Sequence, residues 1–80
     1  MTITNNDIII DVARDLRGVI SLGLGAQQMT EDELAKRLGV NQTAVSHWLT
    51  GRCKPRKSRF ADICRAFEIE NVNQALNKYY

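Results

Sequence analysis

Hydrophobic residues recur every three or four positions along most of the chain, which is the spacing of buried stripes on α-helices. The first stripe predicts one buried helix over residues 8–20, with Asn5 or Asn6 as its N-cap. Residues 22–28 contain two glycines and are expected to form a loop. Alternating patterns typical of strands are nearly absent, so the sequence predicts an all-α fold.

The next two helices are marked by capping signals. Thr30 and Glu33 have the spacing of a capping box, and acidic residues follow Thr30 where the helix dipole favours negative charge. This helix is expected to stop at Gly39. Asn41 is a natural N-cap for a following helix over residues 42–50.

Two further helices are expected in the C-terminal third. A basic loop over residues 52–57 precedes a helix that begins near Lys57 or Ser58, and Asn71 is expected to cap a short last helix. Their inner faces consist of Phe60, Ile63, Cys64, Phe67, Val72, Ala75, Leu76 and Tyr79. The pattern predicts a compact bundle of five short helices, forming a single domain over residues 1–80.

Residues 30–51 have the layout of a helix-turn-helix core. Two helices of about eight residues are separated by a tight turn, for which Gly39 supplies the conformation that side chains disfavour. Ala35 is small where the second helix must cross close to the first. The expected core between the two helices comprises Leu34, Leu38, Val40, Val45 and Trp48.

This stretch resembles a known family. It reads TEDELAKRLGVNQTAVSHWLTG, followed by RCKP, and is similar to the Cro/C1-type (XRE-like) helix-turn-helix domain of phage repressors and their bacterial relatives. The likeness covers about residues 29–70. It implies a lambda-repressor-like DNA-binding fold and binding of operator DNA. Leu49 stands where many members carry Glu, and the loop before Met29 looks longer than usual.

Positive charge is concentrated in the middle of the chain, although the net charge is only +2. Residues 1–33 contain six acidic residues against two arginines, whereas residues 34–59 contain seven basic residues and no acidic one. Such a local basic surface fits a nucleic-acid partner, although a solvated charged face is the simpler reading.

The helix over residues 42–50 is expected to read DNA bases. Its outer face carries no acidic residue, so it can approach a major groove without repulsion from phosphate. Gln42 can make a bidentate contact to adenine, and the resemblance points to the same positions for base readout. The candidates are Gln42, Thr43, Ser46 and His47.

Phosphate contacts are expected on both sides of this helix. Free N–H groups at a helix N-terminus bind phosphate, and basic side chains neutralise it without reading sequence. The candidates are Thr30, Glu31, Asn41, Thr50, Arg52, Lys54, Arg56, Lys57 and Arg59.

One recognition helix reads only a few base pairs, so we expect a homodimer on a near-palindromic site, formed mainly on DNA. The last helix is the candidate dimer contact, with Val72, Leu76, Tyr79 and Tyr80. Alternatively, these side chains complete the core of the monomer.

The predicted function is a cytoplasmic, sequence-specific DNA-binding regulator, most simply a Cro-like repressor. The alternative is a protein-interaction module or antitoxin with the same fold. No signal peptide, membrane span, cofactor, small-molecule ligand or enzymatic activity is expected. The two cysteines and one histidine are too few for a structural zinc site, and the thiols are expected to be reduced.

Overall fold

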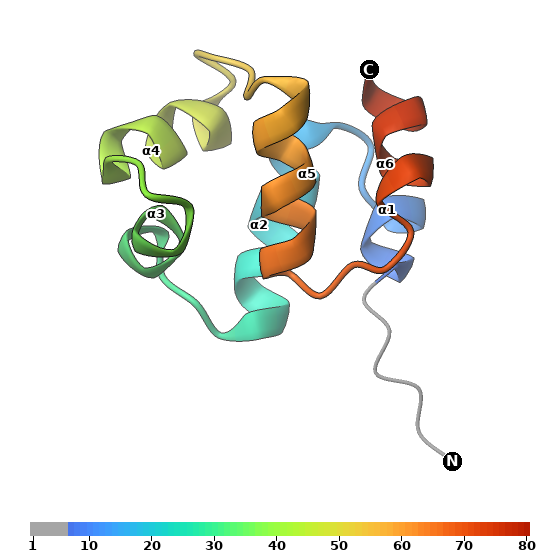
Figure 1. Cartoon of the computed structure of the whole chain (residues 1–80), viewed down its shortest axis with the longest axis horizontal. Coiled ribbons are helices and arrows are strands. Elements are labelled where there is room, and N and C mark those ends of the chain that lie inside the picture. The colour runs from blue at the N-terminus through green and yellow to red at the C-terminus, as the bar shows by residue number, and fades with distance from the viewer. Residues whose placement is uncertain (1–6) are drawn as a thin grey trace.

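The structure is a computed structural model that describes residues 7–80. Within this range it contains helices and no strand. The helices are α1 (Ile8–Val12), α2 (Leu16–Gln27), α3 (Glu31–Leu38), α4 (Gln42–Thr50), α5 (Lys57–Ala66) and α6 (Val72–Tyr79). In Figure 1, α3 and α4 lie on one side, α5 crosses the centre, and α1 and α6 lie on the other side. The all-α prediction is confirmed. The expected caps Asn5 and Asn6 lie outside the described residues.

The predicted first helix over residues 8–20 is wrong, because the chain breaks it into α1 and α2. Ala13 adopts an extended conformation (ψ 133°) and ends α1. Asp15 then caps a new helix, since its side chain accepts a hydrogen bond from the Gly18 N–H at 2.9 Å. Of residues 7–80, six helices therefore form where five were expected from the whole sequence.

The predicted loop over residues 22–28 is also wrong, because α2 continues to Gln27. Gly23 faces the ring of Phe67 so closely that an added Cβ would lie 2.2 Å from a ring carbon. Gly23 is therefore a packing residue inside a helix. The helix ends at Gln28, which adopts a left-handed conformation (φ 52°).

The caps of α3 follow the prediction closely, whereas the N-cap of α4 follows it in position only. Thr30 Oγ accepts from the Glu33 N–H, and Glu33 accepts from the Thr30 N–H, so the capping box is complete. Gly39 ends α3 at φ 72° and Gly51 ends α4 at φ 78°, both left-handed conformations that favour glycine. Asn41 occupies the N-cap position of α4, without a side-chain cap bond.

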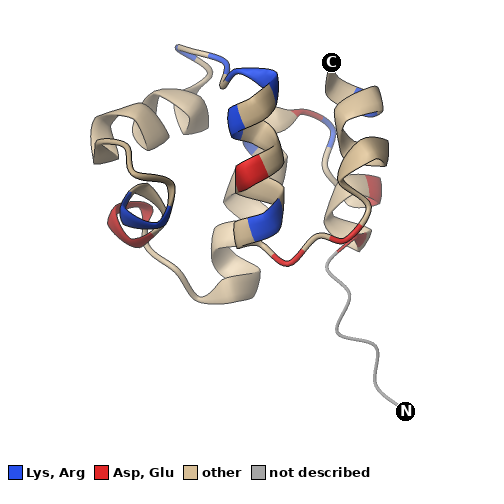
Figure 2. Cartoon of the chain, in the orientation of Figure 1, with Lys and Arg blue, Asp and Glu red and all other residues tan. Residues whose placement is uncertain are grey.

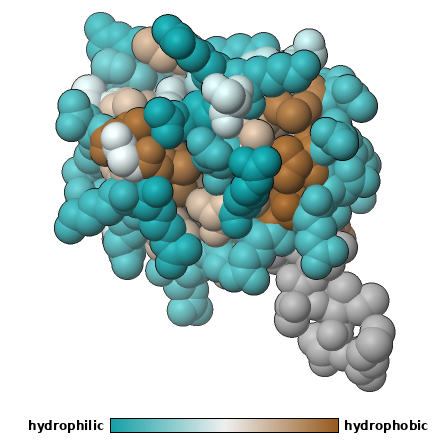
Figure 3. All heavy atoms as spheres, in the orientation of Figure 1, coloured by the Kyte–Doolittle hydropathy of each residue, from teal (hydrophilic) through white to brown (hydrophobic). Residues whose placement is uncertain are grey.

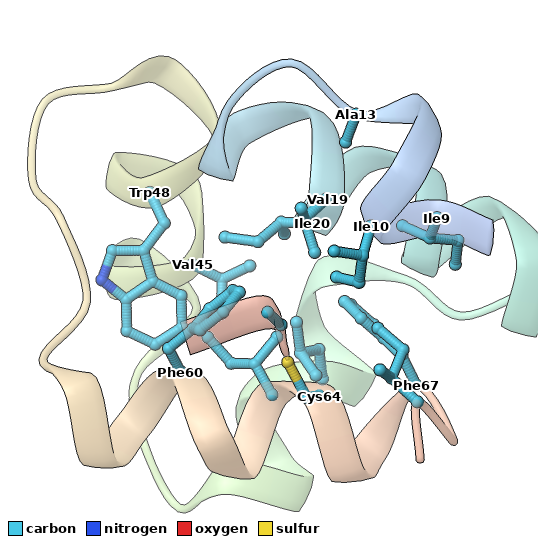
Figure 4. Packing of buried hydrophobic residues seen from close by; sticks show 14 of the residues in the cluster. Ile9, Ile10, Ala13, Val19, Ile20, Val45, Trp48, Phe60, Cys64 and Phe67 are labelled. Atoms are coloured by element: carbon cyan, nitrogen blue, oxygen red, sulfur yellow. The ribbon is translucent and has the colours of Figure 1, made fainter. Parts of the chain in front are cut away.

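One hydrophobic cluster holds the helices together. Figure 4 shows Val45 and Trp48 of α4 pointing toward Phe60 of α5. Trp48 is 8% exposed, which confirms core packing rather than a surface role. Cys64 also lies in this core, and burial raises the pKa of its thiol to about 11. Cys64 and the exposed Cys53 are both free thiols.

Hydrophilic side chains cover most of the face shown in Figure 3, with hydrophobic surface in smaller areas. The large apolar side chains that remain exposed include Ile8, Val12 and Leu22 on α1 and α2. Among residues 7–80, no helix combines the length and the hydrophobicity that a bilayer span requires.

Candidate nucleic-acid interface

The helix-turn-helix core consists of α3, a three-residue turn over residues 39–41, and α4. In the turn, the Gly39 N–H bonds back to the carbonyls of Ala35 and Lys36. Leu34 and Ala35 of α3 and Val45 of α4 are buried in the same cluster. The geometry of the turn and this buried contact fix the direction of α4, so its opposite face is presented outward.

The outer face of α4 carries the four side chains predicted to read bases. Gln42 and Thr43 are exposed, and Ser46 and His47 are half-buried. The structure therefore places all four on one helix, within two turns. Lys, Arg, Asp and Glu are all absent from residues 42–50, and Figure 2 accordingly shows α4 entirely in tan. Such a surface offers hydrogen-bonding groups to a major groove without repelling phosphate.

The basic loop and the start of α5 follow directly after α4, and four of the five predicted phosphate-binding cations are exposed there. These are Arg52, Lys54, Arg56 and Lys57. Figure 2 shows their positive charge along the loop and the first turn of α5. Lys54 also donates to the carbonyl of Tyr79 at 3.0 Å, which connects the loop to the C-terminal end of α6.

Arg59 differs from the other cations of this segment. Its side chain donates to the carbonyl of Leu38 at 2.8 Å and lies 3.9 Å from Asp62. Leu38 is the last residue of α3, where free carbonyls and the helix dipole favour a cation. Arg59 therefore connects α5 to the C-terminal end of α3, a structural contact that its place in a basic run did not indicate.

Arg17 lies near this surface although it comes from a distant part of the sequence, and its guanidinium is paired with Asp15 at 3.1 Å. It belongs to α2, and an added Cβ at Gly51 would lie 3.1 Å from its Cδ atom. Arg17 thus lies against the C-terminal end of α4, beside an open hollow of about 460 Å³ that Arg14 and Lys54 also line. Both arginines lie in the acidic first third of the sequence, and the packing of α2 against α4 brings Arg17 beside Gly51.

The N-terminal end of α3 has the opposite charge. Glu31, Asp32 and Glu33 occupy its first turn. The Thr30 N–H, one of the groups expected to bind phosphate, is donated to Glu33 at 2.9 Å. That bond lowers the pKa of the Glu33 carboxyl. Glu31 accepts a hydrogen bond from Ser46 of α4 at 2.6 Å. Both expected phosphate contacts at this end therefore have partners within the chain.

Thr50 and Asn41 lie at the two ends of α4, as the prediction of phosphate contacts requires, and both are exposed. Thr50 Oγ donates to the carbonyl of His47 at 3.3 Å. Their contacts with phosphate stay predictions.

The candidate dimer residues of α6 pack largely within their own chain. Val72 and Leu76 are half-buried against the core. The Tyr79 hydroxyl donates to the carbonyl of Ala13 at 2.8 Å, and the Tyr80 hydroxyl donates to the carbonyl of Pro55. These contacts fit the alternative in which the side chains complete the monomer, and the dimer contact stays a prediction.

Comparison with protein families gives one clear result. The sequence model of a family described as a helix-turn-helix domain matches residues 13–75, well over half of the 80-residue chain. The match includes α2 to α5 completely and the first part of α6. Searches of curated proteins and of solved structures find no match.

Proposed function

The chain belongs to the helix-turn-helix domain family, of the Cro/C1 (XRE-like) type, and we propose that it is a sequence-specific regulator of transcription, most simply a repressor. One observation carries the proposal. Helix α4 presents a polar outer face without acidic residues, and exposed cations lie beside its C-terminal end. This combination suits a helix that enters a major groove while its surroundings bind the DNA backbone.

In the proposed complex, Gln42 at the start of α4 reads adenine through its N6 and N7 atoms. Thr43, Ser46 and His47 contact neighbouring base edges. The exposed cations of the loop and Lys57 neutralise phosphates. Two copies bind a near-palindromic operator, because a single α4 reaches too few base pairs for specificity. No catalytic step belongs to this role, and a cytoplasmic location follows from it.

The test is selection of binding sites from a random duplex pool, with wild type compared with Gln42→Ala. Gln74→Ala is the matched control, because Gln74 is an exposed glutamine on α6. We expect wild type to enrich a short symmetric motif. Gln42→Ala should relax one base pair in each half-site, at a cost of about 1–3 kcal/mol for each half-site of the best duplex. Gln74→Ala should select the wild-type motif unchanged.

Affinity for the selected duplex should also fall steeply as salt is raised, since each neutralised phosphate contributes about 0.9 to the logarithmic slope. Only weak, salt-sensitive binding without an enriched motif would contradict the proposal. It would favour a protein partner instead.

A further inference from the structure

The three acidic residues in the first turn of α3 have three different partners. Glu33 completes the capping box with Thr30. Asp32 pairs with Lys36 of the same helix at 3.2 Å. Glu31 alone reaches α4, where its carboxylate accepts a hydrogen bond from the Ser46 hydroxyl. The cap of α3 is complete without Glu31, so helix capping does not explain the contact of Glu31 with Ser46.

The chemistry of the carboxylate identifies the donor and the acceptor of this bond. The Ser46 Oγ and Glu31 Oε1 atoms are 2.6 Å apart, which is typical of a hydroxyl that donates to an ionised carboxylate. An ionised carboxylate can only accept, so the single hydrogen of the hydroxyl points toward Glu31. The Ser46 oxygen keeps its lone pairs for any further partner. A serine without this contact could either donate or accept.

We infer that Glu31 is a positioning residue that makes Ser46 an acceptor-only reader of the major groove. Ser46 then selects a base with an amino group at the groove edge, either adenine through N6 or cytosine through N4. Guanine and thymine present acceptor oxygens there, so an acceptor on Ser46 would face another acceptor. This inference rests on the proposed function and specifies the chemistry of one position in its site.

The surroundings of Glu31 fit this role better than a phosphate contact. Its own carboxylate and those of Asp32 and Glu33 give this end of α3 a negative charge, which repels a phosphate. The exposed cations of the loop and of the start of α5 follow the C-terminal end of α4. Glu31 is half-buried, and its bond to Ser46 connects α3 and α4, whose Ala35 and Val45 are buried in the same hydrophobic cluster. The hydroxyl is therefore held in place before DNA arrives.

The experiment compares sites selected by wild type, Ser46→Ala and Glu31→Ala. Asp32→Ala is the matched control, because it removes a carboxylate from the same helical turn but contacts Lys36 instead of α4. The selected duplexes are then measured by titration, with each base placed in turn at the position that Ser46→Ala relaxes. Far-UV circular dichroism checks that every variant has the helix content of wild type.

We expect wild type to prefer adenine or cytosine at that position by about tenfold. Ser46→Ala and Glu31→Ala should each abolish the preference, and the double variant should lose nothing more. Asp32→Ala should keep it. Both carboxylate removals should raise affinity for all duplexes alike, since each removes a negative charge near DNA. The change in base preference therefore separates the hydrogen bond from the charge.

Two results would overturn the inference while leaving the proposed function intact. One is a wild-type preference for guanine or thymine at the position that depends on Ser46. The other is a Glu31→Ala protein that keeps the amino-base preference. If wild type enriched no motif at all, the inference and the proposed function would fall together.

Discussion

The inner and outer faces of α4 are under different constraints, packing on the inner face and binding on the outer face. Val45 and Trp48 on the inner face are 0% and 8% exposed, whereas Gln42 and Thr43 on the outer face are exposed. Volume and burial restrict the residue types on the inner face, because a well-packed core penalises any lost or added atoms. The outer face is restricted only by what it must bind. Substitutions on the two faces should therefore separate the stability of the fold from the reading of DNA.

The largest effect is expected on the inner face. Trp48→Ala removes most of a buried side chain and should lower the free energy of unfolding by about 3–5 kcal/mol. DNA binding should be lost with it, because little of so small a domain would stay folded. Urea unfolding followed by far-UV circular dichroism measures the change.

Thr43→Ala is the outer-face control for this comparison. It removes an exposed side chain of the same helix and should change stability by no more than about 0.5 kcal/mol. If both variants unfolded at the same urea concentration as wild type, Trp48 would not belong to the core in solution.

The same contrast explains which parts of the structure could be predicted from the sequence. Helices α3 and α4 were predicted with the correct ends, because their caps are local signals of one to four residues. The outer face of α4 followed from the helical period alone. The break between α1 and α2 was missed, although Asp15 and Gly18 have the spacing of a cap.

Contacts between distant residues account for the other differences. Lys78 and Tyr79 of α6 donate to the carbonyl of Ala13, where the chain leaves α1. The close approach of Phe67 explains Gly23 inside α2, and the packing of α2 against α4 places Arg17 beside Gly51. A single sequence does not reveal such pairs. The bond between Glu31 and Ser46 is of the same kind, so the charge of Glu31 was visible in the sequence but its partner was not.

Smaller effects on stability should distinguish two kinds of cation in the basic segment, those bonded within the protein and those exposed to solvent. Arg59 is bonded to the last carbonyl of α3, whereas Lys57 is exposed at the start of α5. Arg59→Ala should lower the free energy of unfolding by about 1.5 kcal/mol, the order expected for a hydrogen bond to a charged group. Lys57→Ala should leave stability nearly unchanged.

The effects of the two variants on DNA binding should have the reverse order, with the larger change for Lys57→Ala. Lys57→Ala should reduce the logarithmic salt slope by about 0.9 for each bound copy, the share of one phosphate contact, and so by about 1.8 for the proposed dimer. For Arg59→Ala, the change in slope should be smaller, since the guanidinium already has partners in the protein. Equal effects of both variants on stability and on the salt slope would show that the two cations are not different in kind.

The smallest effect is expected at the capping box of α3, on the acidic side of neutral pH. The hydrogen bond from the Thr30 N–H holds the pKa of Glu33 below its ordinary value of 4.5. A lowered pKa means that the folded state favours the carboxylate. The contribution of Glu33 to stability is therefore complete above about pH 4.5 and is lost as pH falls through its pKa in the folded state.

Glu33→Gln keeps an oxygen that can accept the same bond but cannot ionise. Wild type should therefore be slightly more stable than Glu33→Gln near pH 7, and the difference should vanish near pH 2. Glu70→Gln, which removes an exposed carboxylate outside the helices, is the matched control. Thermal unfolding across this pH range measures the difference, and a gap that stayed constant down to pH 2 would exclude ionisation of Glu33 as its source.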